Sequence, residues 1–200
     1  MAEAMTHVTP SLADGRLVLR PWRDTDVAEL HAAVQESVAS VGRWLPWCRA
    51  DYDLDRARAW TRHCHETWRT GTQFAFAVRD VASDELLGGC GLNQINPLHR
   101  SANLGYWIRA SRHGQGLAAA ATRLVARFGF AELGLIRIEI VTLPDNHASR
   151  RVAEKSGAVF EAMARQRLWA WDRAHDAAVY ALIPADLAQP AAAQNAATSS

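Results

Sequence analysis

Length, composition and charge narrow the classes of protein to which the chain can belong. It has 200 residues, 49% of them hydrophobic, which suits one domain with a sizeable core. With 22 basic and 21 acidic residues the net charge is +1, which argues against broad nucleic-acid binding because such binding needs a strongly basic face. The sequence contains no apolar run of the about 18 residues that a membrane span needs. Residues 1–16 also lack the apolar centre of a signal peptide. We therefore expect a cytoplasmic protein, monomeric or homodimeric, that binds neither nucleic acid nor membrane.

The number and spacing of the cysteines argue against a disulfide framework and against a zinc site. Cys48, Cys64 and Cys90 are odd in number and form no C-x-x-C pair. Because free cysteine is often buried, we expect all three to be reduced and partly buried.

The N-terminal part predicts a strand followed by helices. Residues 1–15 are polar and are expected to be flexible. Arg16–Trp22 alternates apolar and basic residues, which is typical of a half-buried strand. A helix is expected to follow Asp24, and a second short helix is expected over Ser37–Trp44, ended by Pro46.

The middle of the chain predicts one long helix and an antiparallel meander. Asp53–Gly71 carries apolar residues at helical spacing and ends on a glycine. Gln73–Arg79 and Leu86–Ile95 read as paired strands, and Ala102–Arg109 as the next strand.

The C-terminal part alternates helices and strands. Gln115–Phe130 is alanine-rich and strongly favours a helix, while Ile136–Leu143 is an apolar run typical of a central strand. Ala148–Ser156 is predicted as a helix, and Val159–Trp169 with Ala177–Ile183 as a final antiparallel pair. This order indicates a mixed α/β sheet with helices on both faces.

The domain is expected to span residues 16–184. The stretch 185–200 is rich in Ala, Gln and Ser, a low-complexity composition that predicts a disordered tail. No internal repeat divides the chain further.

The most informative segment, residues 105–118, runs from a strand through a glycine turn into a helix. Gly114 and Gly116 allow a tight turn and close approach of a ligand. Free N–H groups at the start of a helix favour an anion such as a pyrophosphate, and Arg112 and His113 could add positive charge. The alternative is an ordinary strand–helix turn, since neither the dinucleotide nor the P-loop fingerprint is met.

A second segment, residues 145–157, directly follows the apolar strand. Asp145, Asn146 or Ser149 could simply cap the helix. In the functional alternative Asn146 and Ser149 face a ligand cleft at the edge of the sheet. Basic residues that could then reach a phosphate are Arg150, Arg151 and Lys155.

Together these segments resemble the GNAT superfamily, and in particular its branch that acetylates the N-termini of ribosomal proteins. The branch motifs G-Y-W-[IL], G-x-G-x-A and N-x-x-S-x-x-[VL]-x-x-K-x-G stand at residues 105–108, 114–118 and 146–157. The early R-L-x-L-R-P-W strand and the R-W-L-P-W segment at residues 43–47 are similar too, so the resemblance covers residues 16–184.

The resemblance implies a mostly antiparallel sheet that is splayed at a central parallel pair of strands, here Ala102–Arg109 and Ile136–Leu143. The pantetheine arm of acetyl-coenzyme A (acetyl-CoA) would lie in the gap, and no metal is implied. The backbone of Trp107, Ile108 and Arg109 would pair with the pantetheine amides. Residues implied to surround the pyrophosphate are Arg112, His113, Gly114, Gln115, Gly116, Leu117 and Ala118, where His113 replaces the usual Gln or Arg.

The resemblance also implies a reaction in which a neutral amine attacks the thioester directly. Asn146 would bind the pantetheine arm, and Ser149 would lie near the sulfur as the acid for the thiolate. The glutamate base of the ribosomal branch aligns with Leu168, and Asn103 replaces a glutamate of other GNAT enzymes, so the base is unknown. Substitutes, besides a water chain, are His31, Glu36, His99 and Asp176.

The acceptor is less defined than the donor. Trp44 and Trp47 flank Leu45 and Pro46 in a region that covers the acceptor cleft in the related branch, so one of them is a candidate acceptor contact. A protein N-terminus, a small-molecule amine and an amino acid remain open as acceptors, and succinyl-CoA remains open as a donor. A catalytically silent domain that binds CoA or a partner protein is the alternative from another functional class.

Overall fold

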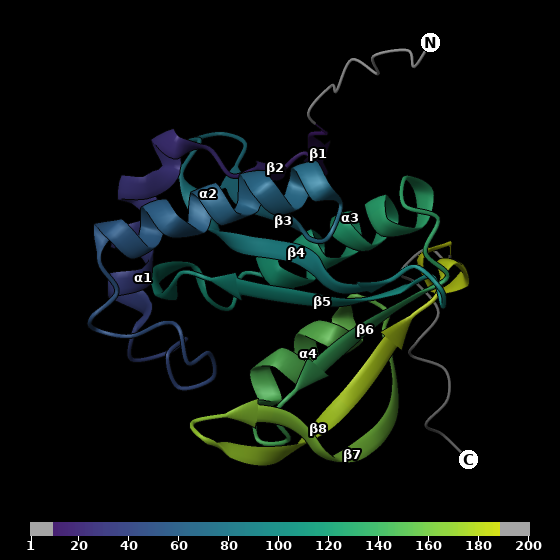
Figure 1. The fold of residues 1–200 in the computed structure, drawn as a ribbon. Coiled ribbons are helices and arrows are strands. Elements are labelled where there is room, and N and C mark those ends of the chain that lie inside the picture. Colours follow the sequence, from purple (N-terminus) through teal and green to yellow (C-terminus); the bar gives the residue numbers. More distant parts are fainter. Residues whose placement is uncertain (1–9, 189–200) are drawn as a thin grey trace.

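A computed structural model describes residues 10–188 and has a mixed α/β architecture (Figure 1). Eight strands form one sheet in the order β1-β2-β3-β4-β5-β6-β8-β7, and every neighbouring pair is antiparallel except β5 and β6. The strands are β1 (Leu12–Ala13), β2 (Leu17–Pro21), β3 (Phe74–Asp80), β4 (Leu86–Asn96), β5 (Ser101–Ile108), β6 (Arg137–Thr142), β7 (Val159–Ala170) and β8 (Arg173–Leu182). The α-helices are α1 (Val27–Ser37), α2 (Leu54–Thr70), α3 (Leu117–Ala131) and α4 (His147–Lys155).

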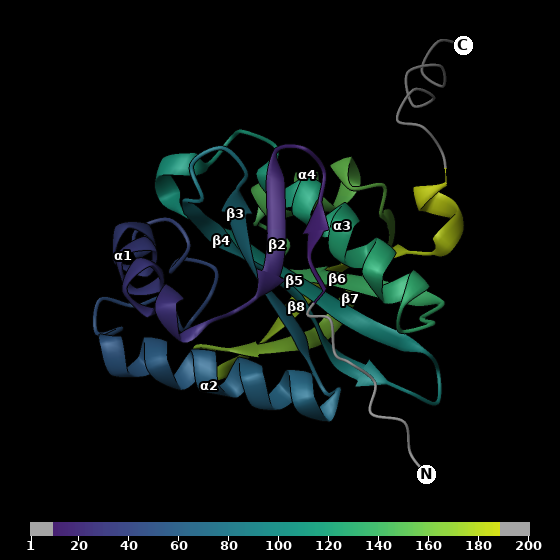
Figure 2. The same cartoon turned by 90° about the horizontal axis from the view of Figure 1, so that it is seen from above.

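Helices cover both faces of the sheet, as the sequence predicts (Figure 2). On one face α3 and α4 enclose a core that includes Leu92, Val125 and Ile138, all fully buried. On the other face α1 and α2 enclose a second core around Trp22 and Leu30. Successive side chains of a strand point to opposite faces, so membership of these two cores assigns a face to each strand residue.

The parallel pairing of β5 with β6 is short. Ser101, Ala102 and Asn103 pair with Arg137, Ile138 and Glu139, after which the pairing stops. Beyond this point β5 stays paired with β4, and β6 stays paired with β8, while the two strands separate (Figure 1). We call the three pairs the fork, and residues 104–108 and 140–142 the diverging edges. The predicted splayed pair is confirmed.

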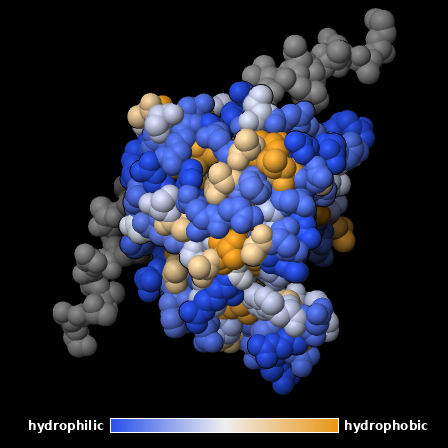
Figure 3. Space-filling view, turned by 90° about the vertical axis from the view of Figure 1, so that its left-hand side faces the viewer, coloured by the Kyte–Doolittle hydropathy of each residue, from blue (hydrophilic) through white to orange (hydrophobic). Residues whose placement is uncertain are grey.

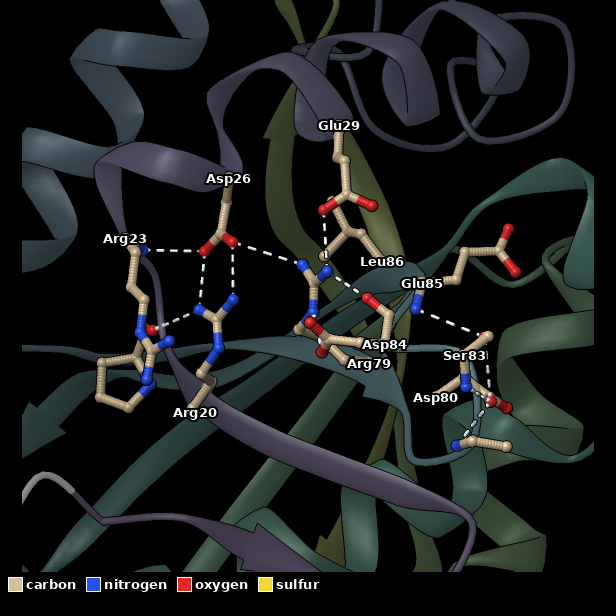
Figure 4. Close-up of polar contacts among 12 residues, drawn as sticks. Arg20, Arg23, Asp26, Glu29, Arg79, Asp80, Ser83, Asp84, Glu85 and Leu86 are labelled. Atoms are coloured by element: carbon tan, nitrogen blue, oxygen red, sulfur yellow. Dashed lines mark hydrogen bonds and ion pairs between the residues drawn. The ribbon is translucent and has the colours of Figure 1, made fainter.

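A buried ion-pair network fixes the start of α1 against β2 and β3 (Figure 4). The Asp26 carboxylate is almost fully buried and accepts two hydrogen bonds from Arg20, at 2.7 and 2.8 Å. Arg79 reaches Asp26 at 3.3 Å, Glu29 at 2.8 Å and Asp84 at 2.7 Å. Burial by itself raises the pKa of Asp26, but the hydrogen bonds from Arg20 and the Arg23 N–H outweigh it, so the pKa lies below its usual range.

Three sequence predictions about the elements differ from the structure. The short helix expected over Ser37–Trp44 is wrong, because this stretch forms separate turns in which Val41 N–H donates to the Ser37 carbonyl and Leu45 N–H to that of Val41. The chain doubles back here so tightly that a Cβ on Gly42 would lie 2.3 Å from the Cys48 carbonyl oxygen. The last strand begins at Arg173 rather than Ala177, and Leu12–Ala13 forms a strand inside the segment expected to be flexible.

The structure also bears on the predictions about the cysteines and about membrane-spanning helices. The cysteines Cys48, Cys64 and Cys90 are free and buried as expected, and burial raises the pKa of Cys64 to about 12. No helix within residues 10–188 combines the length and the apolar character needed to cross a membrane. Most of the expected flexible N-terminus and disordered tail lies outside the described residues, so these two predictions stay untested.

Candidate active site

The glycine turn between β5 and α3 has the geometry of an anion-binding site. Gly114 and Gly116 have φ of +77° and +76°, a left-handed conformation that favours glycine, and no atom lies within 4 Å of a Cβ built on either. Gly116 is the N-cap of α3, and no side chain accepts from the first N–H groups of the helix. The positive end of the helix dipole adds to the attraction of these donors for an anion.

The charged side chains beside the turn are largely committed to other partners. Arg109 donates to Glu36 at 3.0 Å and to Glu85 at 3.0 Å, and Arg112 pairs with Glu85 as well. The His113 Nε2 group lies 2.7 Å from the Ile108 carbonyl oxygen and donates to it. The positive charge expected from Arg112 is therefore offset by Glu85.

A hollow of about 410 Å³ continues from the turn across α3. Gln115 and Gly116 line one end, and the basic residues along it are Arg16, Arg123 and Lys155. Of the basic residues predicted to reach a phosphate from α4, Lys155 alone lines this hollow. Arg150 instead donates to the Tyr180 hydroxyl at 3.0 Å.

The start of α4 separates the two roles suggested for its polar residues. The Asn146 Oδ1 atom accepts from the Ser149 N–H at 3.0 Å, so Asn146 caps the helix. The Ser149 hydroxyl does not cap; it lies 2.9 Å from the hydroxyl of Tyr106. Tyr106 donates its one hydroxyl proton to the Ser149 carbonyl at 2.9 Å, so the Ser149 hydroxyl is the donor between the two hydroxyls, and both contacts tie β5 to α4. Burial raises the pKa of Tyr106 above its usual value, so its hydroxyl stays protonated.

Residues 16–159 match the family described as Acetyltransferase (GNAT) domain. The chain belongs to the GNAT acetyltransferase family. Its members transfer an acetyl group from acetyl-CoA to an amine, and this N-acetyltransferase does so as well.

Individual relatives support the ribosomal-protein branch. YdaF of Bacillus subtilis (strain 168), a proposed ribosomal N-acetyltransferase, is 35% identical over 172 residues, covering 84% of this chain and 91% of that protein. The ribosomal-protein-serine acetyltransferase of Escherichia coli (strain K12) is 35% identical over 101 residues, or 50% of this chain and 56% of that protein. A solved structure of Mycobacterium smegmatis RimJ in complex with CoA-disulfide superposes with a TM-score of 0.77 at 25% identity, covering 92% of this chain and 90% of that chain.

The tryptophans after α1 lie in two different settings in this acetyltransferase. Trp47 is 40% exposed and packs edge-on against Trp107 of β5, with ring centroids 5.5 Å apart. Trp44 is half-buried under the Arg43 guanidinium. Figure 3 looks at the side toward which the diverging edges open and shows hydrophobic surface amid a mostly hydrophilic face. Trp47 therefore has the better position of the two to contact an acceptor.

The four substitutes weighed for the general base lie in different surroundings in this acetyltransferase. The Arg109 hydrogen bond lowers the pKa of Glu36 to about 2, which makes it a weak base. Asp176 accepts from the Gln166 N–H at 2.9 Å within the β7–β8 hairpin. His99 sits in the turn before β5, on the other side of the fork from the diverging edges, and His31 lies on α1.

Two residues near the candidate site were not singled out by the sequence analysis. Tyr106 was visible within the G-Y-W motif, but its contact with Ser149 joins residues 43 positions apart. Glu139 at the fork is the other, because its position depends on the pairing of β5 with β6. Among residues 10–188, no three His, Cys, Asp or Glu side chains come together as metal ligands, and the expectation of a metal-free reaction stays a prediction.

Proposed function

We propose that the chain acetylates the N-terminal amine of a protein in the cytoplasm, and that ribosomal proteins are its acceptors. The observation that carries the proposal is the fork: two diverging strand edges run from it toward an uncapped helix N-terminus, with Ser149 across the gap. The names of YdaF and of the E. coli relative support the acceptor class. That the protein is a monomer or a homodimer stays a prediction.

The donor would lie along the edge of β5. We infer that the backbone of Trp107, Ile108 and Arg109 pairs with the pantetheine amides along the edge of β5 that faces no partner strand. The Arg109 N–H already donates to the Leu87 carbonyl and the Ile108 carbonyl accepts from His113, so the His113 ring must give up this contact before the donor can use that carbonyl. The pyrophosphate would accept from N–H groups of the turn formed by His113, Gly114, Gln115, Gly116, Leu117 and Ala118. The 410 Å³ hollow would then take the phosphorylated adenosine beside Arg16, Arg123 and Lys155.

The leaving group would depart on the α4 side. In this proposal the Asn146 Nδ2 group donates to the pantetheine arm while Oδ1 keeps its cap on α4. The Ser149 hydroxyl donates to the sulfur as the C–S bond breaks, and Tyr106 orients that hydroxyl. Arg112 contributes less than expected, since Glu85 already holds it.

The test is an acetylation assay with defined acceptors. Purified protein is incubated with acetyl-CoA, or in a parallel series with succinyl-CoA, together with one set of acceptors at a time. The sets are ribosomal proteins from unacetylated ribosomes, serine- and alanine-initiated peptides, and spermidine. Release of the thiol gives the rate, and mass spectrometry locates the acetyl group. We expect modification of an N-terminal amine in the first two sets. Turnover with spermidine alone would contradict the acceptor class, and turnover with succinyl-CoA alone would contradict the donor.

A further inference from the structure

Glu139 at the fork is a carboxylate that the proposed transfer has not yet used. We propose that Glu139 accepts the proton of the acceptor amine, and that the amine binds at a row of polar side chains formed by Asn93, Asn103 and Glu139. This inference rests on the proposed transfer to an amine, and it names the place where the amine binds and the group that takes its proton.

Strand register builds the row. Asn93 of β4 pairs with Asn103 of β5, and Asn103 pairs with Glu139 of β6. Directly paired residues in neighbouring strands point to the same face, so the three side chains stand side by side. The Asn103 Nδ2 group donates to Asn93 Oδ1 at 2.9 Å, which confirms their common orientation. All three are half-buried, so a ligand can reach them.

The row lies on the face of the sheet opposite Ser149. Glu139 stands between Ile138 and Ile140, which belong to the core under α3 and α4, so its side chain points to the α1–α2 face. Tyr106 and the Ser149 hydroxyl lie on the α4 side. A thioester held between the diverging edges therefore has a proton acceptor on one face and a proton donor on the other. This arrangement suits entry of the amine from one side and departure of the thiolate on the other.

The charges around Glu139 orient it and leave one oxygen accessible. Arg137 donates to Oε1 at 3.0 Å through Nη2 and is itself held by Glu161. Arg167 of β7 approaches Oε2 at 3.5 Å, a long contact that a substrate amine can compete with. The carboxylate is thus fixed on one side and able to accept a hydrogen bond on the other.

The chemical step balances without any further reactant. The nitrogen lone pair forms the C–N bond, and the carbonyl π electrons move to oxygen. The nitrogen is now positively charged and strongly acidic, so the Glu139 carboxylate takes its proton. The oxyanion collapses, the C–S bond breaks with its electron pair on sulfur, and the thiolate takes the proton of the Ser149 hydroxyl, which regains one from solvent. The products are the acetamide and CoA, and Glu139 returns its proton to solvent.

The experiment compares Glu139→Ala with Glu161→Ala, its matched control. Glu161 shares the Arg137 contact but belongs to β7 and is not a member of the row. The acceptor is the peptide or ribosomal protein that the wild-type enzyme acetylates in the assay above. We expect Glu139→Ala to lower kcat/KM for that acceptor by about 100-fold or more, with the Kd for CoA within about twofold of wild type. Sodium formate should restore part of the lost rate, because a small carboxylate can occupy the vacated place.

Different results would overturn the role of Glu139 and the proposed function. An equal loss in Glu161→Ala, or a loss in Glu139→Ala without rescue by formate, would assign Glu139 to a structural ion-pair network and overturn the inference. Unchanged kcat/KM in Glu139→Ala would do the same. A wild-type protein that binds CoA but acetylates none of the acceptors would overturn the proposed function, and the inference with it. An unfolded Glu139→Ala, detected by its thermal unfolding, is replaced by Glu139→Gln. That variant is judged on kcat/KM against Glu161→Gln alone, because the amide fills the place that formate would occupy.

Discussion

Replacing Gly116 by aspartate tests whether a pyrophosphate lies at the start of α3. A Cβ added at Gly116 meets no atom within 4 Å, so the substitution begins in open space. Its backbone has φ of +76°, a region that Asp and Asn enter more readily than other non-glycine residues. The folded state should lose about 1 kcal/mol through this conformation alone. Any larger change in ligand affinity must then come from the carboxylate.

The expected loss of affinity follows from Coulomb's law. Two unit charges 4 Å apart repel by about 1 kcal/mol in water and by about 4 kcal/mol at the effective dielectric of a protein surface. Gly116 is exposed, so the lower part of this range applies to each of the two pyrophosphate charges. A total of about 2–4 kcal/mol corresponds to roughly 30-fold to 700-fold weaker binding of CoA.

Calorimetric titration of CoA into Gly116→Asp and Gly116→Asn gives the answer. Asparagine has the same shape and backbone cost without the charge, so its Kd should stay within about threefold of wild type. Thermal unfolding of both variants reports the shared backbone effect. Equal CoA affinity of the two folded variants would refute the reasoning and place the pyrophosphate elsewhere.

Three further substitutions test the site and the scaffold. Ser149→Ala should lower kcat by about 100-fold or more with little change in unfolding temperature, since Asn146 caps α4; a normal kcat would make Ser149 structural. Tyr106→Phe should lower kcat by about tenfold but have no further effect when combined with Ser149→Ala, and additive losses would show that the two hydroxyls act separately. Asp26→Asn should cost about 3–5 kcal/mol at pH 7, because Arg20 and Arg79 lose a buried partner. The folded-state pKa of Asp26 is lowered, so its contribution is present above the usual Asp range and disappears as pH falls through the folded pKa; urea unfolding at pH 7 and pH 3 should show a smaller difference between wild type and Asp26→Asn at pH 3.

Local signals explain which parts of the fold were predictable. Gly114 and Gly116 mark a turn that only glycine enters freely, and the alanine-rich run behind them favours a helix in isolation. The expected helix over Ser37–Trp44 failed because periodicity did not reveal the close approach of the backbone at Gly42. Tertiary contact, rather than local preference, determines the conformation of Ser37–Trp44.

The site was predictable only where its residues are neighbours in sequence. Asn146 and Ser149 were both seen as possible caps, and the choice between them required knowing that the Ser149 hydroxyl meets Tyr106. The row at the fork depends on the register of three strands, two of them parallel and separated by a helix. Glu139 therefore appears in the sequence as one of three polar residues of β6, with nothing nearby to indicate its neighbours in the other strands.

The fork divides the eight-stranded sheet into two parts that are joined by a short seam. Within residues 10–188, the five strands β1 to β5 are hydrogen-bonded to the three strands β6, β8 and β7 through three residue pairs alone. A donor that hydrogen-bonds along the diverging edges lengthens this seam, so binding and cohesion of the two sheets are the same event. The folded population then rises with the free concentration of the donor, as for any ligand that binds the native state alone. In a cell with little acetyl-CoA, the enzyme would thus lose both its substrate and part of its resistance to unfolding and proteolysis.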